Sequence, residues 1–227
     1  MTNIIGIYTS LLYTPEKGFA EALKQKVWTL FFPLLLAILI TAVINIYYYN
    51  NVDMPWLLKQ MVANAPKEQK QTILDTLTKT RLVGISLVGV FLLTVSINLF
   101  RGFVYWVILK VSGDGIPFVR LFAIVMWSTA PLLLILPASM LNISISPAGM
   151  LPNDVNPVSL NQLFFKLAGD SPWGQLLSTF SLINLWELFL IIVGLRIATA
   201  RTTLQAFSIA ILPEVIVYGV WIAFLLM

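Results

Sequence analysis

The stretch INLWELFLIIVGLR, residues 183–196, is largely apolar but carries a glutamate within it. It belongs to a longer apolar run, residues 176–200, and about 20 consecutive apolar residues are enough for a helix to cross a bilayer. The run therefore predicts a transmembrane helix with Glu187 deep inside it. A charged residue at that depth is costly to insert, so we expect another span to supply a partner for it.

The composition of the whole chain predicts an integral membrane protein. Of 227 residues, 59% are hydrophobic and 11% are charged, whereas about one quarter of a typical soluble domain is charged. The chain has neither cysteine nor histidine, which removes thiol nucleophiles, imidazole bases and the usual zinc, haem and iron–sulfur ligands. Most familiar catalytic machinery is therefore missing, and we expect no cofactor. The net charge of +4 fits basic helix ends facing the cytoplasm, and we expect no nucleic-acid partner.

Apolar runs of spanning length recur along the chain and predict an all-α, polytopic bundle of five transmembrane helices. The spans are expected at residues 27–49, 82–109, 116–140, 176–200 and 205–227. Residues 27–227 would then form a single membrane domain, preceded by amphipathic helices in residues 1–26. Four prolines lie within the spans and are expected to kink the helices without ending them: Pro33, Pro131, Pro137 and Pro213.

The basic residues near the span ends predict the orientation, because Lys and Arg favour the cytoplasmic side. One side would carry Lys17, Lys24, Lys26, Lys110, Arg120, Arg196 and Arg201, and the other Lys79, Arg81 and Lys166. The amino terminus is therefore expected in the cytoplasm and the carboxyl terminus outside. The first span lacks a small-residue cleavage pattern and is expected to remain as an anchor.

The segments outside the spans also contain helix signals. Before the first span, Tyr8, Leu11 and Phe19 fit two short amphipathic helices, the second starting at Thr14 and Pro15. These helices are expected to lie on the inner leaflet, dock against the bundle or contact a cytoplasmic partner.

Two loops carry further helix signals. Asp53 and Pro66 would each open a helix in the first loop. In the third, SLNQLFFKLAG at residues 159–169 has capping-box spacing and predicts an interfacial helix stopped by Gly169.

Counting from the helix ends places several charges at similar depth. Glu187 and Glu214 lie on consecutive helices, each about 20 Å from the turn near Arg201 at 1.5 Å per residue. Arg101 would lie about 13 Å from the end of its helix, with a side chain long enough to reach further. Asn98 falls on the same helix face as Arg101, and Asn184 on the same face as Glu187. The candidate intramembrane polar cluster is therefore Asn98, Arg101, Asn184, Glu187 and Glu214.

Three interpretations of the cluster stay open. It could fix helix register through interhelical polar contacts. It could instead form a proton relay or ion site, as in a small channel or transporter-like conduit. An intramembrane aspartyl hydrolase would need two aspartates at one depth, and Asp114 lies in a loop. Arg196, near a helix end, is expected to extend to water.

The order of three stretches resembles the Yip1 family of multispanning membrane proteins, in its bacterial branch. These stretches are YTPEKGFAEALKQK (13–26), GIPFVRLFAIVMWSTAPLLL (115–134) and NLWELFLIIVGLRIATARTTLQAFSIAILP (184–213). The resemblance implies five spans, a cytoplasmic amino terminus, a short external carboxyl terminus and no enzyme. Eukaryotic relatives act in membrane traffic and contact small GTPases, usually through a longer amino-terminal region than the one here. The resemblance supplies no site residues.

Together these observations predict a non-enzymatic protein of a bacterial inner membrane with a scaffold, membrane-organising or trafficking-like role. Its expected partners are the lipid bilayer and either other proteins or further copies of itself. The alternative is the small conduit through the polar cluster.

Overall fold

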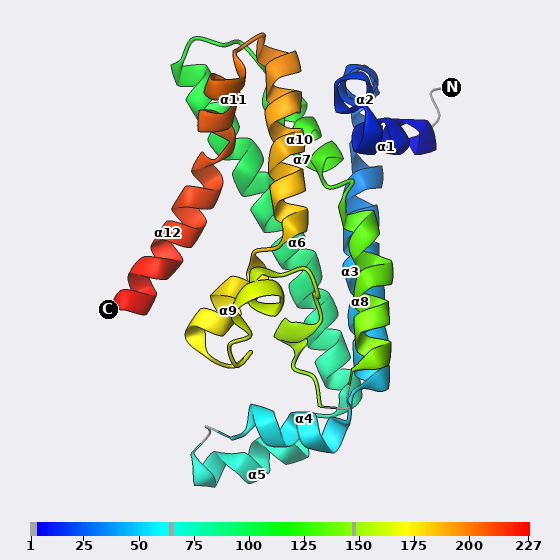
Figure 1. Cartoon of the computed structure of the whole chain (residues 1–227), viewed down its shortest axis with the longest axis vertical. Coiled ribbons are helices and arrows are strands. Elements are labelled where there is room, and N and C mark those ends of the chain that lie inside the picture. The colour runs from blue at the N-terminus through cyan, green and yellow to red at the C-terminus, as the bar shows by residue number, and fades with distance from the viewer. Residues whose placement is uncertain (1–3, 64–65, 147–148) are drawn as a thin grey trace. The chain divides into compact units, whose positions relative to one another are not determined.

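The computed structural model describes residues 4–63, 66–146 and 149–227, and this part of the chain is helical with no named strand (Figure 1). The helices are α1 (Ile4–Tyr13), α2 (Pro15–Ala22), α3 (Phe31–Asn51), α4 (Met54–Met61), α5 (Lys67–Thr76), α6 (Lys79–Val111), α7 (Phe118–Ser128), α8 (Leu132–Ile145), α9 (Pro172–Thr179), α10 (Leu182–Thr199), α11 (Thr203–Ala210) and α12 (Leu212–Leu226). Three short turns complete the order: η1 (Val27–Leu30), η2 (Pro152–Asp154) and η3 (Asn161–Phe165).

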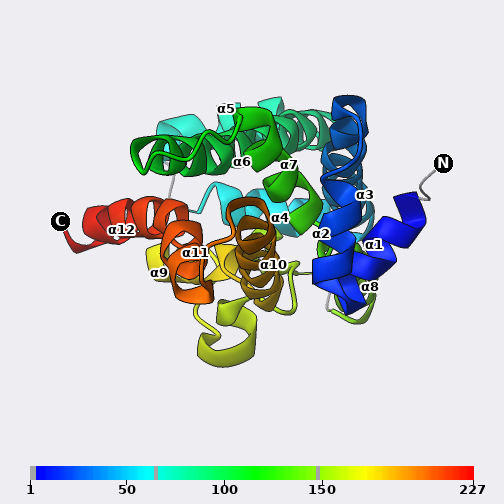
Figure 2. The ribbon, with the colours of Figure 1, turned by 90° about the horizontal axis from the view of Figure 1, so that it is seen from above.

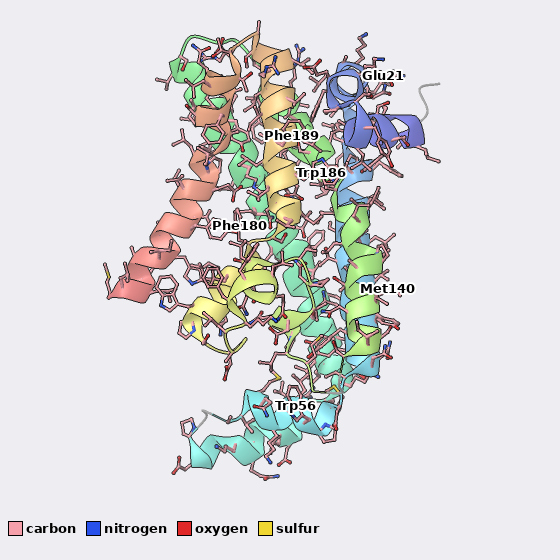
Figure 3. The ribbon with its side chains drawn as sticks, in the orientation of Figure 1. Glu21, Trp56, Met140, Phe180, Trp186 and Phe189 are labelled. Carbon is pink, nitrogen blue, oxygen red and sulfur yellow. The ribbon has the colours of Figure 1, made fainter. Side chains whose placement is uncertain are left out.

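Five helical stretches in the described residues are long and apolar enough to cross a membrane, which confirms the predicted fold class. They are Val27–Asn51, Lys79–Val111, Phe118–Ile145, Leu182–Thr199 and Thr203–Leu226. Large apolar side chains on their surfaces are exposed, among them Trp186 and Phe189 of α10 (Figure 3). An exposed apolar helix surface is what a bilayer would cover.

The fourth span begins at Leu182, later than the apolar run at residue 176 suggested. The run is interrupted at Phe180, whose backbone is extended, so that Pro172–Thr179 forms the separate helix α9. The carbonyl of Phe180 accepts a hydrogen bond from the Leu160 N–H at 2.8 Å, and Ser181 makes an isolated bridge with Ser159. Tertiary hydrogen bonding of the backbone therefore ends the helix where hydropathy alone continues it.

The four prolines behave in two ways. Pro137 lies inside α8, as expected for a proline in a membrane helix, and Pro33 lies in the first turn of α3, directly after η1. Pro131 instead lies in the short break between α7 and α8, and Pro213 lies in the first turn of α12, directly after the break at Ile211. Because proline lacks a backbone N–H and crowds the preceding turn, the third and fifth spans each consist of two helical segments.

The chain forms two compact units, and α3, α6 and α8 contribute residues to both. Unit 1 comprises Met1–Ala37, Leu93–Leu133 and Leu182–Met227, and unit 2 comprises Ile38–Leu92 and Leu134–Ser181. The expected division into an amino-terminal segment, 1–26, and a membrane domain, 27–227, stays a prediction.

In unit 1 the two amino-terminal helices dock against membrane-spanning helices. Helix α1 contacts α7, and α2 contacts both α7 and α10. Ile7, Leu11 and Phe19 are fully buried in the core of the unit, together with Trp127 of α7 and Leu190 of α10. Burial of these apolar faces fixes the amino-terminal segment to the bundle, with the hydrophobic effect as the main driving force.

Gly194 allows α10 to pack closely against α7 and α2. A Cβ atom at this position would lie 2.5 Å from Cγ2 of Ile124 and 3.0 Å from Cε1 of Phe19. We expect Gly194→Ala to lower the free energy of unfolding by about 1–2 kcal/mol, because overpacking strain outweighs the helix propensity of alanine. Unfolding in mixed micelles measures this change.

The matched control for Gly194 is Gly219→Ala in α12, where a new Cβ would meet nothing within 4 Å. This variant should be neutral or slightly more stable, because alanine is the better helix former. If both glycine variants lost the same stability, close packing at Gly194 would not be the cause.

Unit 2 contains the two loop helices expected from the sequence. Asp53 caps α4 by accepting a hydrogen bond from the Trp56 N–H at 3.1 Å, and α5 starts directly after Pro66. The loop after α8 is held by the Tyr48 hydroxyl, which donates to the Met150 carbonyl at 2.7 Å, and by Asn142, which donates to the Asp154 carbonyl at 3.0 Å.

The prediction of an interfacial helix in residues 159–169 is wrong. Only one π-helical turn forms, Asn161–Phe165, and it ends at Lys166 in the left-handed conformation (φ 51°) and not at Gly169. Ser159 accepts the expected bond from the Gln162 N–H, but the Gln162 side chain donates to Asp154 at 2.7 Å. The Asn161 side chain bonds the backbone of Leu167 in both directions, and such local side-chain bonds compete with helix formation.

Candidate functional site: an intramembrane ion cluster

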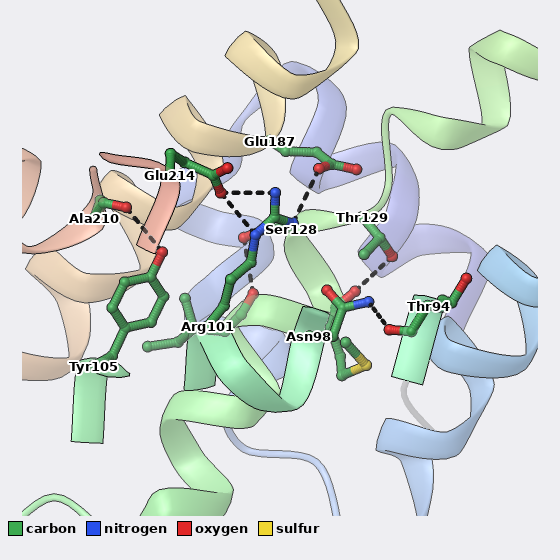
Figure 4. Close-up of polar contacts among 11 residues, drawn as sticks. Thr94, Asn98, Arg101, Tyr105, Ser128, Thr129, Glu187, Ala210 and Glu214 are labelled. Carbon is green, nitrogen blue, oxygen red and sulfur yellow. Dashed lines mark hydrogen bonds and ion pairs between the residues drawn. The ribbon is translucent and has the colours of Figure 1, made fainter. Parts of the chain in front are cut away.

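Arg101 joins two carboxyl groups within unit 1 (Figure 4). Its Nε and Nη2 both lie 2.7 Å from Oε1 of Glu214, and its Nη1 lies 3.5 Å from Oε2 of Glu187. The side chains are 12% exposed for Arg101, 17% for Glu214 and 6% for Glu187. One guanidinium thus links α6, α10 and α12 where little solvent reaches, and its planar fork suits this double contact.

The break in the fifth span positions Glu214. Helix α12 begins at Leu212, so Glu214 lies in its first turn. The first turn of a helix has backbone N–H groups without intrahelical partners and carries partial positive charge, which favours a carboxylate. Glu214 therefore lies both in the first turn of α12 and against Arg101.

The face of α6 that carries Arg101 holds further polar contacts. The Asn98 side chain donates to the Thr94 carbonyl at 2.8 Å, and the Tyr105 hydroxyl donates to the Ala210 carbonyl at 2.9 Å. Ala210 is the last residue of α11, so Tyr105 connects α6 to the break in the fifth span. Oδ1 of Asn98 is buried and has no hydrogen-bond partner in the described part of the chain.

Of the five residues in the candidate cluster, the structure brings three into direct contact: Arg101, Glu187 and Glu214. Asn98 lies one turn from Arg101 but bonds to its own helix. Asn184 lies on α10 one turn before Glu187 and is half-buried. The functional role of these five residues stays a prediction.

Sequence reasoning missed two ion pairs near the helix ends of unit 1. Arg201, after α10, pairs with Asp114, after α6, at 2.5 Å, and Arg196 lies 3.7 Å from Glu16 of α2. The sequence contained a signal for the first pair. Asp114 and Arg201 carry opposite charges and lie in two turns that were expected on the same side of the membrane. The second pair depends on the docking of α2, which spacing along the chain does not reveal.

The charges of the cluster are paired with one another. Within residues 4–63, 66–146 and 149–227, no three Asp or Glu side chains come together as metal ligands. The two glutamates instead share a cation supplied by the chain itself. Charge-assisted hydrogen bonds are strong in a medium of low dielectric, and an unpaired charge there would be costly.

Five apolar spans, amphipathic helices docked on them and polar contacts inside them define a multi-pass membrane protein. A family model described as the Yip1 domain matches residues 9–225, nearly the whole chain. The chain belongs to the Yip1 family, as its sequence resemblance indicated. Comparisons with curated proteins and with solved structures give no match.

Proposed function

We propose that this Yip1-family protein is a non-enzymatic scaffold that organises a bacterial inner membrane, with its amino terminus in the cytoplasm and its carboxyl terminus outside. The observation that carries the proposal is the shared arginine: Arg101 contacts Glu187 and Glu214 at once. A guanidinium engaged by two carboxyl groups joins three helices, and helix–helix polar contacts of this kind contribute to association within membranes.

The docked amino-terminal helices support the scaffold role. Their inner faces are buried against α7 and α10, while Ile5 and Tyr13 on α1 are exposed. Lys17 and Lys24 are also exposed. A rigidly mounted surface with apolar and basic side chains suits contact with an anionic leaflet or with an acidic partner protein.

The second candidate is a small conduit for ions or protons, and one observation favours it. Oδ1 of Asn98 is buried with no partner among the described residues, one turn from Arg101 on the same helix. A buried acceptor of this kind fits a site that water or a permeating ion visits.

Flux through proteoliposomes separates the two functions. We expect vesicles containing the wild-type protein to hold ion and proton gradients as well as protein-free vesicles do, because the arginine and both glutamates are engaged with one another. Glu187→Gln and Glu214→Gln should leave that tightness unchanged. The measurement is the decay of a pH-sensitive dye signal and of a potassium gradient, with an added ionophore as the positive control.

The conduit makes the opposite prediction. Wild-type flux that disappears in Glu187→Gln or Glu214→Gln, while circular dichroism and elution volume stay those of the wild type, would replace the scaffold by the conduit.

A further inference from the structure

Two adjoining cavities lie in unit 1, where the first and third spans begin. The larger has a volume of about 390 Å³ and the smaller about 150 Å³. They share the lining residues Val27, Leu30 and Val119, so they adjoin, and the two together are called the groove. The walls come from the end of α2 and the turn η1 on one side and from α7 on the other, elements that are in contact. Figure 2, seen from above, shows α2, α3 and α7 beside one another.

The larger cavity has a polar and basic mouth. Its lining includes Gln25 and Arg120, and it includes no carboxylate. Arg120 is exposed and has no ion pair among the described residues. Lys24 and Lys26, which flank Gln25 along the chain, are exposed as well, while the nearby Glu21 of α2 lines neither cavity. The mouth therefore favours an anion.

The smaller cavity is entirely apolar. Its lining consists of Val27, Leu30, Phe31, Leu34, Val119 and Phe122. These residues lie in the first turns of the first span and in the first turns of α7. The groove thus has a basic part and an apolar part between two helices. An amphiphile, which has a charged headgroup and an apolar chain, matches both parts.

Neighbouring residues place this change of polarity at the membrane surface. The first span begins at Val27, directly after Lys26. Trp28 is 78% exposed and its ring stacks on that of Phe31 at a centroid distance of 5.9 Å. Exposed tryptophan at a span end is typical of the headgroup region, where lysine and arginine also extend toward water. The basic mouth therefore lies at headgroup depth and the apolar part at acyl-chain depth.

We infer that this groove binds one anionic phospholipid, with its phosphate at Arg120 and one acyl chain between the start of the first span and α7. Basic pockets between transmembrane helices are suited to acidic lipid headgroups, and the combined cavities have the size of a small-molecule site. A soluble phosphate would leave the apolar cavity unfilled, so the occupant is a membrane lipid. The groove lies apart from the contacts of Arg101 and does not depend on the proposed scaffold role.

Native mass spectrometry of the full chain, titrated in detergent with phosphatidylglycerol or phosphatidylcholine, tests the inference. We expect one phosphatidylglycerol to bind in preference to phosphatidylcholine. Arg120→Gln should weaken phosphatidylglycerol binding roughly fivefold, the effect of one basic residue beside an anionic lipid, and Arg120→Lys should retain most of it. Arg81→Gln, which removes an exposed arginine from unit 2, is the charge-matched control and should bind like the wild type.

The apolar part of the groove has its own test. Val119 lines both cavities and is itself exposed, so Val119→Trp should fill the groove and reduce binding without changing the charge. Glycerol phosphate should fail to compete with the lipid. Equal binding of the two lipids, equal losses in Arg120→Gln and Arg81→Gln, unchanged binding in a folded Val119→Trp variant, or full competition by glycerol phosphate would each overturn the inference.

Discussion

Arg101→Met should lower the free energy of unfolding by about 3–5 kcal/mol, the range seen when one partner of a buried ion pair is removed. The guanidinium is the only cation that the structure places against Glu187 and Glu214 among the described residues. Methionine keeps much of the side-chain length and helix propensity but leaves two buried carboxyl groups facing each other. Unfolding of the purified protein in mixed micelles, followed by circular dichroism, measures the loss.

The control for Arg101→Met is a triple variant that also carries Glu187→Gln and Glu214→Gln. Removing all three charges together leaves no buried charge without a partner, so most of the lost stability should return. If the triple variant stayed as unstable as Arg101→Met, then lost packing of the arginine side chain would explain the effect, and the ion cluster would not.

The two glutamates should differ in their contributions to stability. Oε1 of Glu214 lies 2.7 Å from two nitrogens of Arg101, whereas Oε2 of Glu187 lies 3.5 Å from the third. We expect Glu214→Gln to cost about 2–3 kcal/mol, the upper range for a hydrogen bond to a charged group, and Glu187→Gln about 1 kcal/mol or less.

Burial acts in the same direction as these distances. Glu187 is the less exposed of the two carboxylates, so replacing it with a neutral amide also removes a larger desolvation cost. A double-mutant cycle with Arg101→Met gives the coupling of each pair directly. Equal couplings for the two glutamates would contradict the geometry.

The fold was predictable largely because span length and helix depth are simple consequences of helix geometry. Apolar runs of about 20 residues identified the five spans, and counting 1.5 Å per residue brought Glu187, Glu214 and Arg101 to similar depths. Hydropathy did not reveal the extended backbone at Phe180, because that interruption depends on its bond with Leu160, twenty residues earlier in the chain. The prediction of a helix at residues 159–169 was wrong for a related reason. The Asn161 side chain bonds the backbone of Leu167, and this local bond competes with helix formation.

Within the candidate site, polarity and period selected five residues, of which Arg101, Glu187 and Glu214 are in direct contact. The i, i+3 spacing of Asn98 and Arg101 indicated one helix face. It could not show that the Asn98 amide would bond to its own helix. The break before Glu214 and the bond from Tyr105 to Ala210 depend on how α11 and α12 meet, which no periodic pattern describes.

The length of helix α6 makes the protein sensitive to the thickness of its membrane. It has 33 residues, so it is about 50 Å long, whereas the hydrocarbon core of a bilayer is about 30 Å thick. Such a helix must tilt or extend into the headgroups, and Lys79 and Lys110 mark its two basic ends. The tilt of α6 should therefore depend on bilayer thickness. A thicker membrane would allow a smaller tilt from the bilayer normal, and a thinner one would require a larger tilt.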